Sequence, residues 1–242
     1  GDLTTEATIP PGTQVRAEIR SRVPGRIAGV DVIPLALARF PEPASATIVA
    51  ADGSAVAAGD TVARITGAAR TVLSAERTIL NVLGRLSGIA TATAIAVAGT
   101  AGTRAVIKDT RKTTPGLRTL ERYAVAVGGG VNHRFGLHDA VLIKDNHIGI
   151  AGSITEAVAR TRAALGASFA IQVEVDTLAQ LDEALAANAD VVLLDNMTPS
   201  QLKNAVAMAA GKAVTEASGS VTRVSAPAIA ESGVDLISVG WI

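Results

Sequence analysis

From residue 100 onward, short β-rich runs alternate with alanine-rich amphipathic stretches, and this alternation constrains the fold more than any other feature of the sequence. Strand–helix alternation at intervals of about 20–35 residues is typical of right-handed βαβ units that build a parallel sheet. The amphipathic stretches, which we expect to be helices, include residues 155–165, 178–187 and 200–210. The β-rich runs, which we expect to be strands, are residues 105–108, 140–143, 170–175, 191–194, 213–215 and 235–239.

Polar and charged residues stand at or just past the carboxyl end of nearly every one of these runs. In a β/α barrel those ends converge on one mouth, where catalytic residues sit. In an open sheet, six strand ends would not all reach one ligand. The pattern therefore favours a β/α barrel over an open sheet. The strand-end residues are Lys108, Asp109, Arg111, Lys112, Lys144, Asp145, Glu174, Asp176, Asp195, Asn196, Glu216, Ser218, Gly219 and Gly240.

The residues before the barrel pattern form a separate N-terminal region. Apolar and polar residues alternate over 14–20, which predicts a half-buried strand, and residues 51–62 predict a hairpin. The hairpin resembles parts of biotinyl or lipoyl carrier domains, but such a carrier needs a lysine at a turn and the first lysine here is Lys108. We therefore expect two domains, 1–99 with a linking helix and 100–242.

The linking helix is expected to begin at Ser74, which can cap it, with apolar residues at helical spacing after it. Arg77 would then lie in the first turn, where a cation opposes the helix dipole at a cost of about 0.3–1 kcal/mol. An unfavourable position of this kind suggests a functional role. The alternative is a solvated arginine paired with Glu76 or Asp60.

The composition argues against several classes of protein. The 242 residues carry 22 Lys and Arg against 22 Asp and Glu, so no net charge attracts nucleic acid or an anionic membrane. Five aromatic residues are too few for base-stacking platforms. The absence of Cys excludes a thiolate nucleophile and fits a cytoplasmic protein. No apolar run approaches the roughly 18–20 residues of a membrane span. We expect neither a nucleic-acid nor a membrane partner.

The charge is unevenly distributed along the chain. Residues 104–147 carry eight Lys and Arg against four Asp and Glu, and residues 148–242 carry five against ten. This distribution suggests one site that faces both an anion and a cation; clustered surface charge is the alternative. The usual nucleotide-binding loops and the H-E-x-x-H metal motif are absent, and the three histidines lack metal-site spacing.

Four cationic or cationisable side chains follow the first two barrel strands: Arg111, His133, Arg134 and Lys144. Guanidinium groups bind carboxylates bidentately, so such a cluster suits a small dicarboxylate. The triple glycine at 128–130 is expected to let the backbone pass close to a ligand and to position the residues that follow. Surface salt bridges remain the alternative for any single one of the four.

Eight short motifs run in order along the chain. In the first part they are Gly-Asp-Leu-Thr-Thr at 1–5 and Glu-Arg-Thr-Ile-Leu-Asn at 76–81. Later they are Thr-Arg-Lys-Thr at 110–113, Gly-Gly-Val-Asn-His-Arg at 129–134, Leu-Ile-Lys-Asp-Asn-His at 142–147, Val-Glu-Val at 173–175, Leu-Asp-Asn at 194–196 and Glu-Ala-Ser-Gly at 216–219. Together they closely resemble the quinolinate phosphoribosyltransferase family, the carboxylating nicotinate-nucleotide pyrophosphorylases.

The resemblance implies an α/β fold in which an N-terminal α/β sandwich precedes an incomplete β/α barrel of fewer than eight strands. It implies a pentosyltransferase that condenses quinolinate with phosphoribosyl pyrophosphate and Mg²⁺, giving nicotinate mononucleotide, pyrophosphate and CO₂ in NAD biosynthesis. It also implies a homodimer with shared active sites, or a hexamer of such dimers. The alternatives are a relative on the same scaffold associated with molybdate transport and a catalytically dead binding barrel.

The resemblance also assigns site residues by position. Lys112 would neutralise pyrophosphate, and Glu174 and Asp195 would contact the ribose hydroxyls and lie near Mg²⁺, which the substrate itself mainly holds. These three are the expected catalytic residues, and they also bind phosphoribosyl pyrophosphate. The residues expected to bind quinolinate are Arg111, His133, Arg134 and Lys144, with Arg77 supplied by the neighbouring subunit. The residues expected to cradle the ribose 5-phosphate are Ser218, Gly219 and Gly240.

The sequence departs from the family pattern at three places. It begins at the Gly-Asp-Leu-Thr motif, where the family has a leading segment, and Ser220 replaces a glycine. After Gly240 it reads Trp241-Ile242, where the family has a small residue, Leu-Thr-His-Ser and a tail that packs on the first domain. These departures bear on the phosphate cradle and on closure of the domains.

Overall fold

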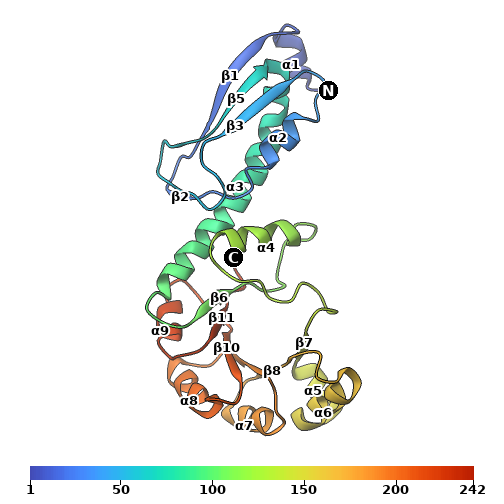
Figure 1. The fold of residues 1–242 in the computed structure, drawn as a ribbon, viewed down its shortest axis with the longest axis vertical. Helices are drawn as coiled ribbons and strands as arrows, with labels where there is room; N and C mark the ends of the chain where they lie inside the picture. The colour runs from blue at the N-terminus through green and yellow to red at the C-terminus, as the bar shows by residue number, and fades with distance from the viewer. The chain divides into compact units, whose positions relative to one another are not determined.

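A computed structural model describes residues 1–242, which divide into two compact units (Figure 1). The first contains residues 1–94 and 119–129, and the second contains residues 95–118 and 130–242. The boundary expected from the change of sequence rhythm lies between residues 99 and 100. The contacts divide the chain between residues 94 and 95 instead, and they return residues 119–129 to the first unit.

The first unit is built on an antiparallel sheet with the strand order β1-β5-β3. Its strands are β1 (Gln14–Arg20), β3 (Ala44–Ile48) and β5 (Thr61–Ala68), and a second pair joins β2 (Gly25–Arg26) to β4 (Ala55–Val56). The expected strand at 14–20 is confirmed, with alternate residues half-buried. Helices α1 (Leu3–Thr8) and α2 (Val32–Leu37) complete the unit with the long helix α3 (Ala69–Gly99). The core between sheet and helices includes Ile33, Ile65 and Ile79.

Helix α3 begins earlier than the sequence predicted. It starts at Ala69, so Ser74 is an interior residue whose hydroxyl donates to Asp2 Oδ2 at 3.1 Å rather than capping the helix. Arg77 consequently lies beyond the first turn, and the predicted conflict with the helix dipole was wrong. The strand β5 runs directly into the helix, and the backbone N–H of Ala69 donates to the carbonyl oxygen of Thr13 at 2.8 Å. Arg77 instead pairs loosely with Glu76, at 3.9 Å.

Helix α4 (Arg118–Val127) explains why residues 119–129 belong to the first unit. The buried Glu121 accepts hydrogen bonds from Arg85 of α3. A Cβ on Gly128 would lie 2.6 Å from the carbonyl oxygen of Ala90, also in α3. The first glycine of the triple therefore permits close packing of two helices, not the predicted close approach to a ligand.

Helix α3 is the one helix long and apolar enough to span a membrane, with a mean hydropathy of 1.5 over 18 residues. We did not expect a helix of this length and hydropathy from the sequence, because Thr91 and Thr93 interrupt the apolar run. They do not lower the mean hydropathy of the helix enough to exclude it. A helix of this kind is weak evidence, since core helices of soluble proteins meet the same criteria. Ile79 and Leu83 of α3 belong to the core of the first unit.

The second unit contains six parallel strands in the order β6-β11-β10-β9-β8-β7. All six predicted strands are confirmed. Their bounds are β6 (Val106–Lys108), β7 (Val141–Ile143), β8 (Ile171–Val175), β9 (Val191–Asp195), β10 (Val214–Ser218) and β11 (Leu236–Ser238). The ladder does not close between β6 and β7, so the sheet forms the incomplete barrel with fewer than eight strands that was expected.

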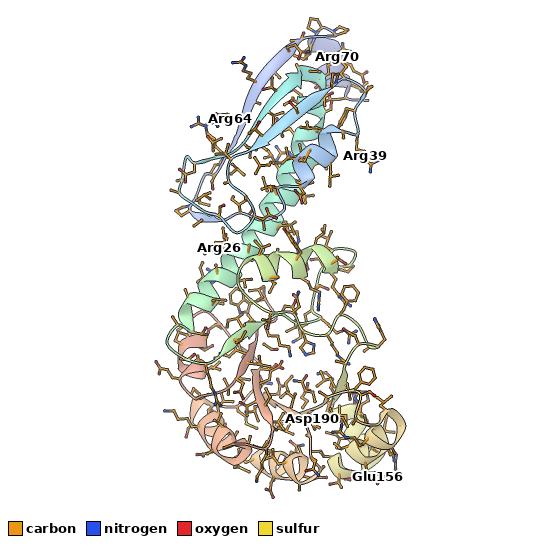
Figure 2. All side chains as sticks on the ribbon, viewed as in Figure 1. Arg26, Arg39, Arg64, Arg70, Glu156 and Asp190 are labelled. Atoms are coloured by element: carbon orange, nitrogen blue, oxygen red, sulfur yellow. The ribbon has the colours of Figure 1, made fainter.

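Helices follow the strands around the outside of this curved sheet (Figure 1). They are α5 (Asp145–Ala151), α6 (Ile154–Leu165), α7 (Leu178–Ala186), α8 (Pro199–Ala209) and α9 (Ala226–Ala230). Capping boxes at Thr177 and Thr198 begin α7 and α8. Their apolar faces pack on the strands in one core that includes Val173, Leu181 and Leu194. Polar side chains such as Glu156 and Asp190, like Arg39 and Arg64 of the first unit, lie at the surface (Figure 2).

Candidate functional site

The second unit contains a cavity of about 420 Å³ whose lining residues come from five of the six strand ends and the loops beside them. Strand ends of a parallel sheet point the same way, so their last residues meet at one edge. Most of the residues predicted to bind or react line this cavity. The lining residues are Thr110, Arg111, Lys112, His133, Arg134, Leu142, Lys144, Glu174, Leu193, Asp195, Ser218 and Ser238.

The loop after the glycine triplet is tied to β6 and to Asp109, the residue that follows β6. Val131 bridges Lys108 as a short extension of the sheet, and Asp109 accepts the backbone N–H of His133 at 2.5 Å. Arg118 then joins the loops, because its guanidinium donates to the carbonyl oxygens of Arg111 and Phe135. The cationic residues before and after the glycine triplet are thus held side by side, as predicted.

Two guanidinium groups, those of Arg111 and Arg134, line the cavity close to each other. Arg111 Nε is buried and has no hydrogen-bond partner. Burial, and then the charge of Arg111, lower the pKa of Arg134 from its usual value. The Arg134 Nη1 donates to the carbonyl oxygen of Ala140 at 3.1 Å, which orients its guanidinium. A buried donor without a partner is costly, so this arrangement is suited to an anionic ligand.

On the opposite side of the cavity, Lys144 and Glu174 form an ion pair. Lys144 immediately follows β7, and Glu174 lies in β8, the neighbouring strand. Asp195, the last residue of β9, accepts a hydrogen bond from Asn196 Nδ2 at 2.7 Å. The two carboxylates predicted to act on the ribose and metal therefore line the same cavity as the cations.

Ser218 lines the cavity, whereas Gly219 and Gly240 lie beside the lining residues rather than among them. Gly219 has a φ of +88°, and a Cβ there would lie 2.7 Å from the backbone nitrogen of Asn196. A Cβ on Gly240 would lie 3.3 Å from Lys112 Cδ. Both glycines therefore leave room where backbone passes close to neighbouring groups, one of which belongs to the predicted pyrophosphate site.

Arg77 is the one predicted site residue that lies in the first unit. It lines a different cavity, of about 560 Å³, with Arg20, Arg22 and Glu18. Its side chain is 75% exposed and its guanidinium lies 3.9 Å from the Glu76 carboxylate. This is the solvated arginine paired with Glu76 that the sequence left open as the alternative.

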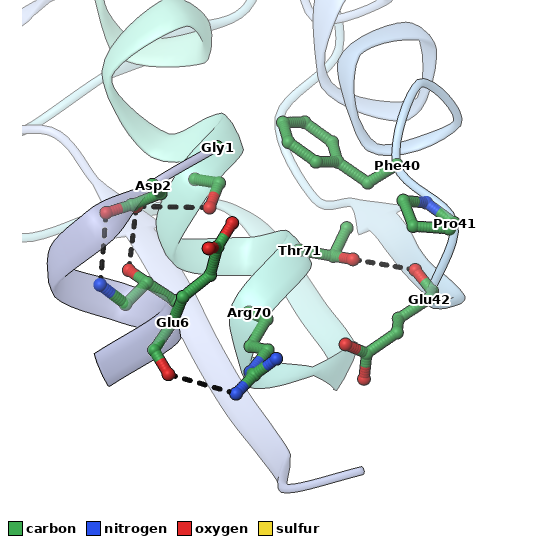
Figure 3. A pocket seen from close by; sticks show the side chains of 10 residues that line it. Gly1, Asp2, Glu6, Phe40, Pro41, Glu42, Arg70 and Thr71 are labelled. Carbon is green, nitrogen blue, oxygen red and sulfur yellow. Dashed lines mark hydrogen bonds between the residues drawn. The ribbon is translucent and has the colours of Figure 1, made fainter. Parts of the chain in front are cut away.

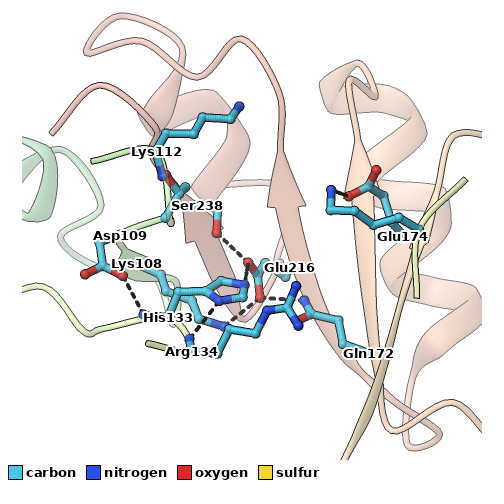
Figure 4. Close-up of polar contacts among 11 residues, drawn as sticks. Lys108, Asp109, Lys112, His133, Arg134, Gln172, Glu174, Glu216 and Ser238 are labelled. Atoms are coloured by element: carbon cyan, nitrogen blue, oxygen red, sulfur yellow. Dashed lines mark hydrogen bonds and ion pairs between the residues drawn. The ribbon is translucent and has the colours of Figure 1, made fainter. Parts of the chain in front are cut away.

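The sequence did not predict a buried polar network beneath the cavity (Figure 4). Glu216 is 0% exposed, and it accepts hydrogen bonds from Lys108, Gln172 and Ser238. Burial favours a raised pKa for this carboxyl, but the charge of Lys108 and the hydrogen bonds outweigh burial and hold the pKa below its usual value. The expected strand at 213–215 ended too early, so Glu216 was placed past the strand end. Polar residues inside otherwise apolar strands, as in Ile-Gln-Val-Glu-Val at 171–175, were the available signal.

A second cavity, of about 580 Å³, lies in the first unit (Figure 3). Its polar groups are largely bound to one another. Arg70 donates to the carbonyl oxygens of Glu6 and Ile9, and Thr71 donates to that of Glu42. These bonds tie α1 and the loop before β3 to α3, which is a structural role.

The acidic residues fit a metal ion only as partial ligands. No group of three or more His, Asp and Glu side chains that could hold a metal occurs in residues 1–242. Mg²⁺ is commonly held by one or two carboxylates together with substrate phosphates. Glu174 and Asp195 meet that description, since both line the cavity.

Comparisons with known proteins cover both units. The family model described as quinolinate phosphoribosyl transferase, N-terminal domain, matches residues 2–87, and that of the C-terminal domain matches residues 89–242. The chain is 44% identical over 243 residues to the probable carboxylating nicotinate-nucleotide pyrophosphorylase of Bacillus subtilis (strain 168), covering 100% of this chain and 83% of that protein. It is 45% identical over 244 residues to the carboxylating enzyme of Mycobacterium leprae (strain TN), covering 99% and 86%.

Solved structures agree with this match. The nicotinate-nucleotide pyrophosphorylase of Francisella tularensis has a TM-score of 0.94 and is 40% identical, covering 99% of this chain and 85% of that one. The similarity extends across both units at an identity well above the level at which only a fold is shared.

Proposed function

The chain belongs to the quinolinate phosphoribosyltransferase family, and from that membership we propose that it is a carboxylating nicotinate-nucleotide pyrophosphorylase. It transfers phosphoribosyl from phosphoribosyl pyrophosphate to quinolinate with decarboxylation, giving nicotinate mononucleotide, pyrophosphate and CO₂ for NAD biosynthesis. The relatives described above carry this activity in their names, which disfavours the relative associated with molybdate transport. The same names disfavour a catalytically dead binding barrel.

The observation that carries the substrate assignment is the buried, unpartnered Arg111 Nε beside Arg134. Quinolinate has two adjacent carboxylates, and a guanidinium group donates two parallel hydrogen bonds to a carboxylate. We assign one or both carboxylates to Arg111 and Arg134, with His133 and Lys144 completing the set. The Lys144 ammonium must then exchange Glu174 for a substrate carboxylate.

Phosphoribosyl pyrophosphate occupies the other side of the same cavity in this proposal. Glu174 and Asp195 contact the ribose hydroxyls, and Ser218 with Gly219 and Gly240 surrounds the 5-phosphate. Lys112 lies beside Gly240, and we assign its ammonium to the diphosphate. Glu174 and Asp195 would lie near a Mg²⁺ ion held mainly by the diphosphate, and that ion would supply positive charge that makes pyrophosphate a better leaving group.

The chemistry then follows from electrostatics. The C1′–O bond breaks, its electron pair leaves with pyrophosphate, and the Lys112 ammonium neutralises the developing charge. The ribosyl cation that forms is stabilised by the carboxylates and is captured by the lone pair of the pyridine nitrogen. As CO₂ leaves, the electron pair of the C–carboxylate bond stays on the ring carbon beside the nitrogen, where the positive charge of the nitrogen stabilises it, and a proton then bonds to that carbon. The departing carboxylate must be held less tightly than the retained one, because equal binding would stabilise the ground state.

We further propose that the active unit is a homodimer, or a hexamer of dimers, in which Arg77 reaches the partner's cavity. The exposed guanidinium of Arg77 supports this, because Glu76 holds it only at 3.9 Å. The chain contains no Cys, in keeping with the cytoplasm as its compartment.

The binding of substrate analogues tests the dicarboxylate assignment. We expect nicotinate to bind about ten- to a hundredfold more weakly than quinolinate in calorimetric titrations, because it leaves a buried cation unpaired. Benzene-1,2-dicarboxylate is the matched control: it keeps both carboxylates, so it should bind, but without a ring nitrogen it cannot react. Equal affinity for nicotinate and quinolinate would refute the dicarboxylate site. A purified protein that binds quinolinate but releases no pyrophosphate with phosphoribosyl pyrophosphate and Mg²⁺ would favour the dead barrel.

A further inference from the structure

The buried carboxylate of Glu216 has no role among the binding and catalytic residues assigned above. It lies in the middle of β10, beneath the cavity and with no exposed surface. It is not among the residues that line the cavity, so it does not reach a substrate. Two of its neighbours, Ser238 and His133, do line the cavity. Figure 4 shows Glu216 between these residues and Gln172.

The carboxylate connects strands that are not neighbours in the sheet. Lys108 of β6 donates to Oε2 at 2.9 Å, and Gln172 of β8 donates to the same oxygen at 2.8 Å. These two strands lie on opposite sides of β10 in the strand order. Ser238 of β11 donates to Oε1. Three of the roughly four acceptor positions of a carboxylate are therefore filled by strands of the barrel.

Oε1 also faces the imidazole of His133, whose Nε2 lies 4.0 Å away. The other ring nitrogen, Nδ1, accepts the backbone N–H of Arg134 at 2.7 Å. That contact places the proton of a neutral ring on Nε2, directed toward the carboxylate. The ring thus stands between the Glu216 carboxylate and the backbone from which the Arg134 guanidinium enters the cavity.

We propose that Glu216 is a positioning residue, which orients the His133 imidazole and through it the backbone of Arg134. Lys108 balances its charge, so the pair adds no net charge beneath the cavity and acts through geometry. The inference rests on the proposed function for the identity of the ligand. It goes beyond that function because it gives a role to a residue that touches no substrate.

The substitution Glu216→Gln tests the proposal through the quinolinate Kd, measured by calorimetry. Glutamine keeps the shape of the side chain and removes its charge. We expect Kd to rise about tenfold or more, as for the loss of a hydrogen bond to a charged group. If Glu216 acted on quinolinate only through its charge, the substitution would lower Kd instead, because removing a negative charge near the cavity would tighten binding of a dicarboxylate. An equal or lower Kd would therefore overturn the proposal.

Glu156→Gln, at an exposed ion pair with Arg160, is the matched control and should leave the quinolinate Kd unchanged.

A paired variant separates positioning from stability. Glu216→Gln alone leaves the buried Lys108 ammonium without a counterion, which should lower the melting temperature. Lys108→Met with Glu216→Gln removes both charges and should restore the melting temperature, while quinolinate binding stays weak. If the single variant fails to fold, the paired variant carries the test. Wild-type affinity in the paired variant would show that Glu216 serves stability alone.

A double-mutant cycle with His133→Gln tests whether Glu216 acts through the imidazole. In that background Glu216→Gln should change Kd much less than in the wild type. If the effects of the two substitutions on the binding free energy were fully additive, Glu216 would not act through His133. A wild-type protein that does not bind quinolinate would refute the proposed function, and this assignment with it. Binding that Glu216→Gln leaves unaffected would refute the positioning role alone.

Discussion

Lys144 illustrates how a single residue at a strand end can serve the cavity rather than the core. Its side chain is 44% exposed and pairs with Glu174. An ion pair at a solvent-accessible position contributes about 0–1 kcal/mol to stability, because water screens the charges. The fold therefore depends little on Lys144, whereas the proposed substrate needs its positive charge.

We expect Lys144→Ala to lower kcat/KM at least about a hundredfold, the scale of losing a charged contact in the transition state. The melting temperature should change little. Lys203→Ala on the exposed face of α8 is the matched control and should retain full activity. Steady-state kinetics and thermal melts of both variants check the prediction; a large fall in the melting temperature of Lys144→Ala would make the residue structural.

At the scale of elements, the contact between α3 and α4 decides which residues belong to the first unit. Arg85 and Glu121 join the two helices, and Ala28, Leu86, Ala90 and Ala124 form a small apolar cluster there. Ala and Gly let helices approach closely, because they add little volume at the contact. Gly128 extends this close contact beyond the end of α4.

The substitution Gly128→Ala should destabilise this contact by about 1–3 kcal/mol through overpacking, because the added Cβ would meet Ala90 O and Thr93 Cβ at 2.6 Å. Gly84→Ala in α3 is the control, since a Cβ there has nothing within 4 Å. Alanine has the higher helix propensity, so that variant should be as stable as the wild type or up to about 1 kcal/mol more stable. Urea unfolding of both variants provides the comparison. Equal stabilities would show that α3 and α4 can shift to accommodate the added Cβ without loss of stability.

At the scale of the whole molecule, the proposed dimer joins an arginine of one chain to the cavity of another. Arg77 lies in the first unit and Lys144 in the second. If the active sites are shared in an isologous dimer, each site takes Arg77 from one subunit and Lys144 from the other. The two residues can then complement each other between chains.

We expect the homodimers Arg77→Ala and Lys144→Ala to fold but to be inactive. In a mixed dimer, one site receives both lesions and the other receives neither. Random exchange of equal amounts makes half of the dimers mixed, so activity should return to about a quarter of the wild-type value. Mass spectrometry confirms the exchange. Confirmed mixed dimers without activity would place Arg77 in its own subunit's site, because every site would then carry one lesion.

Local patterns in the sequence were enough to predict the six barrel strands and the position of most cavity residues. Strand alternation and strand-end polarity depend on residues close in the chain, and parallel strands bring their ends together by geometry. The four cations predicted to gather, Arg111, His133, Arg134 and Lys144, do line one cavity. Their roles toward quinolinate, and that of Mg²⁺, stay predictions.

Three other features were decided only by the tertiary structure, because each depends on contacts between distant residues. The start of α3 at Ala69 depends on the pairing of β5 with β1 and β3 and on the acceptor that Thr13 provides for the Ala69 N–H. This start moved Arg77 out of the first turn. Residues 119–129 belong to the first unit because Glu121 pairs with Arg85 and because Gly128, which has no Cβ, allows close contact with the backbone of α3. Glu216 looked like a strand-end residue, but the barrel interior buried it and supplied its partners from three other strands. A buried charge is tolerated only where such partners converge, and that convergence depends on the packing of four strands together and not on any short stretch of sequence.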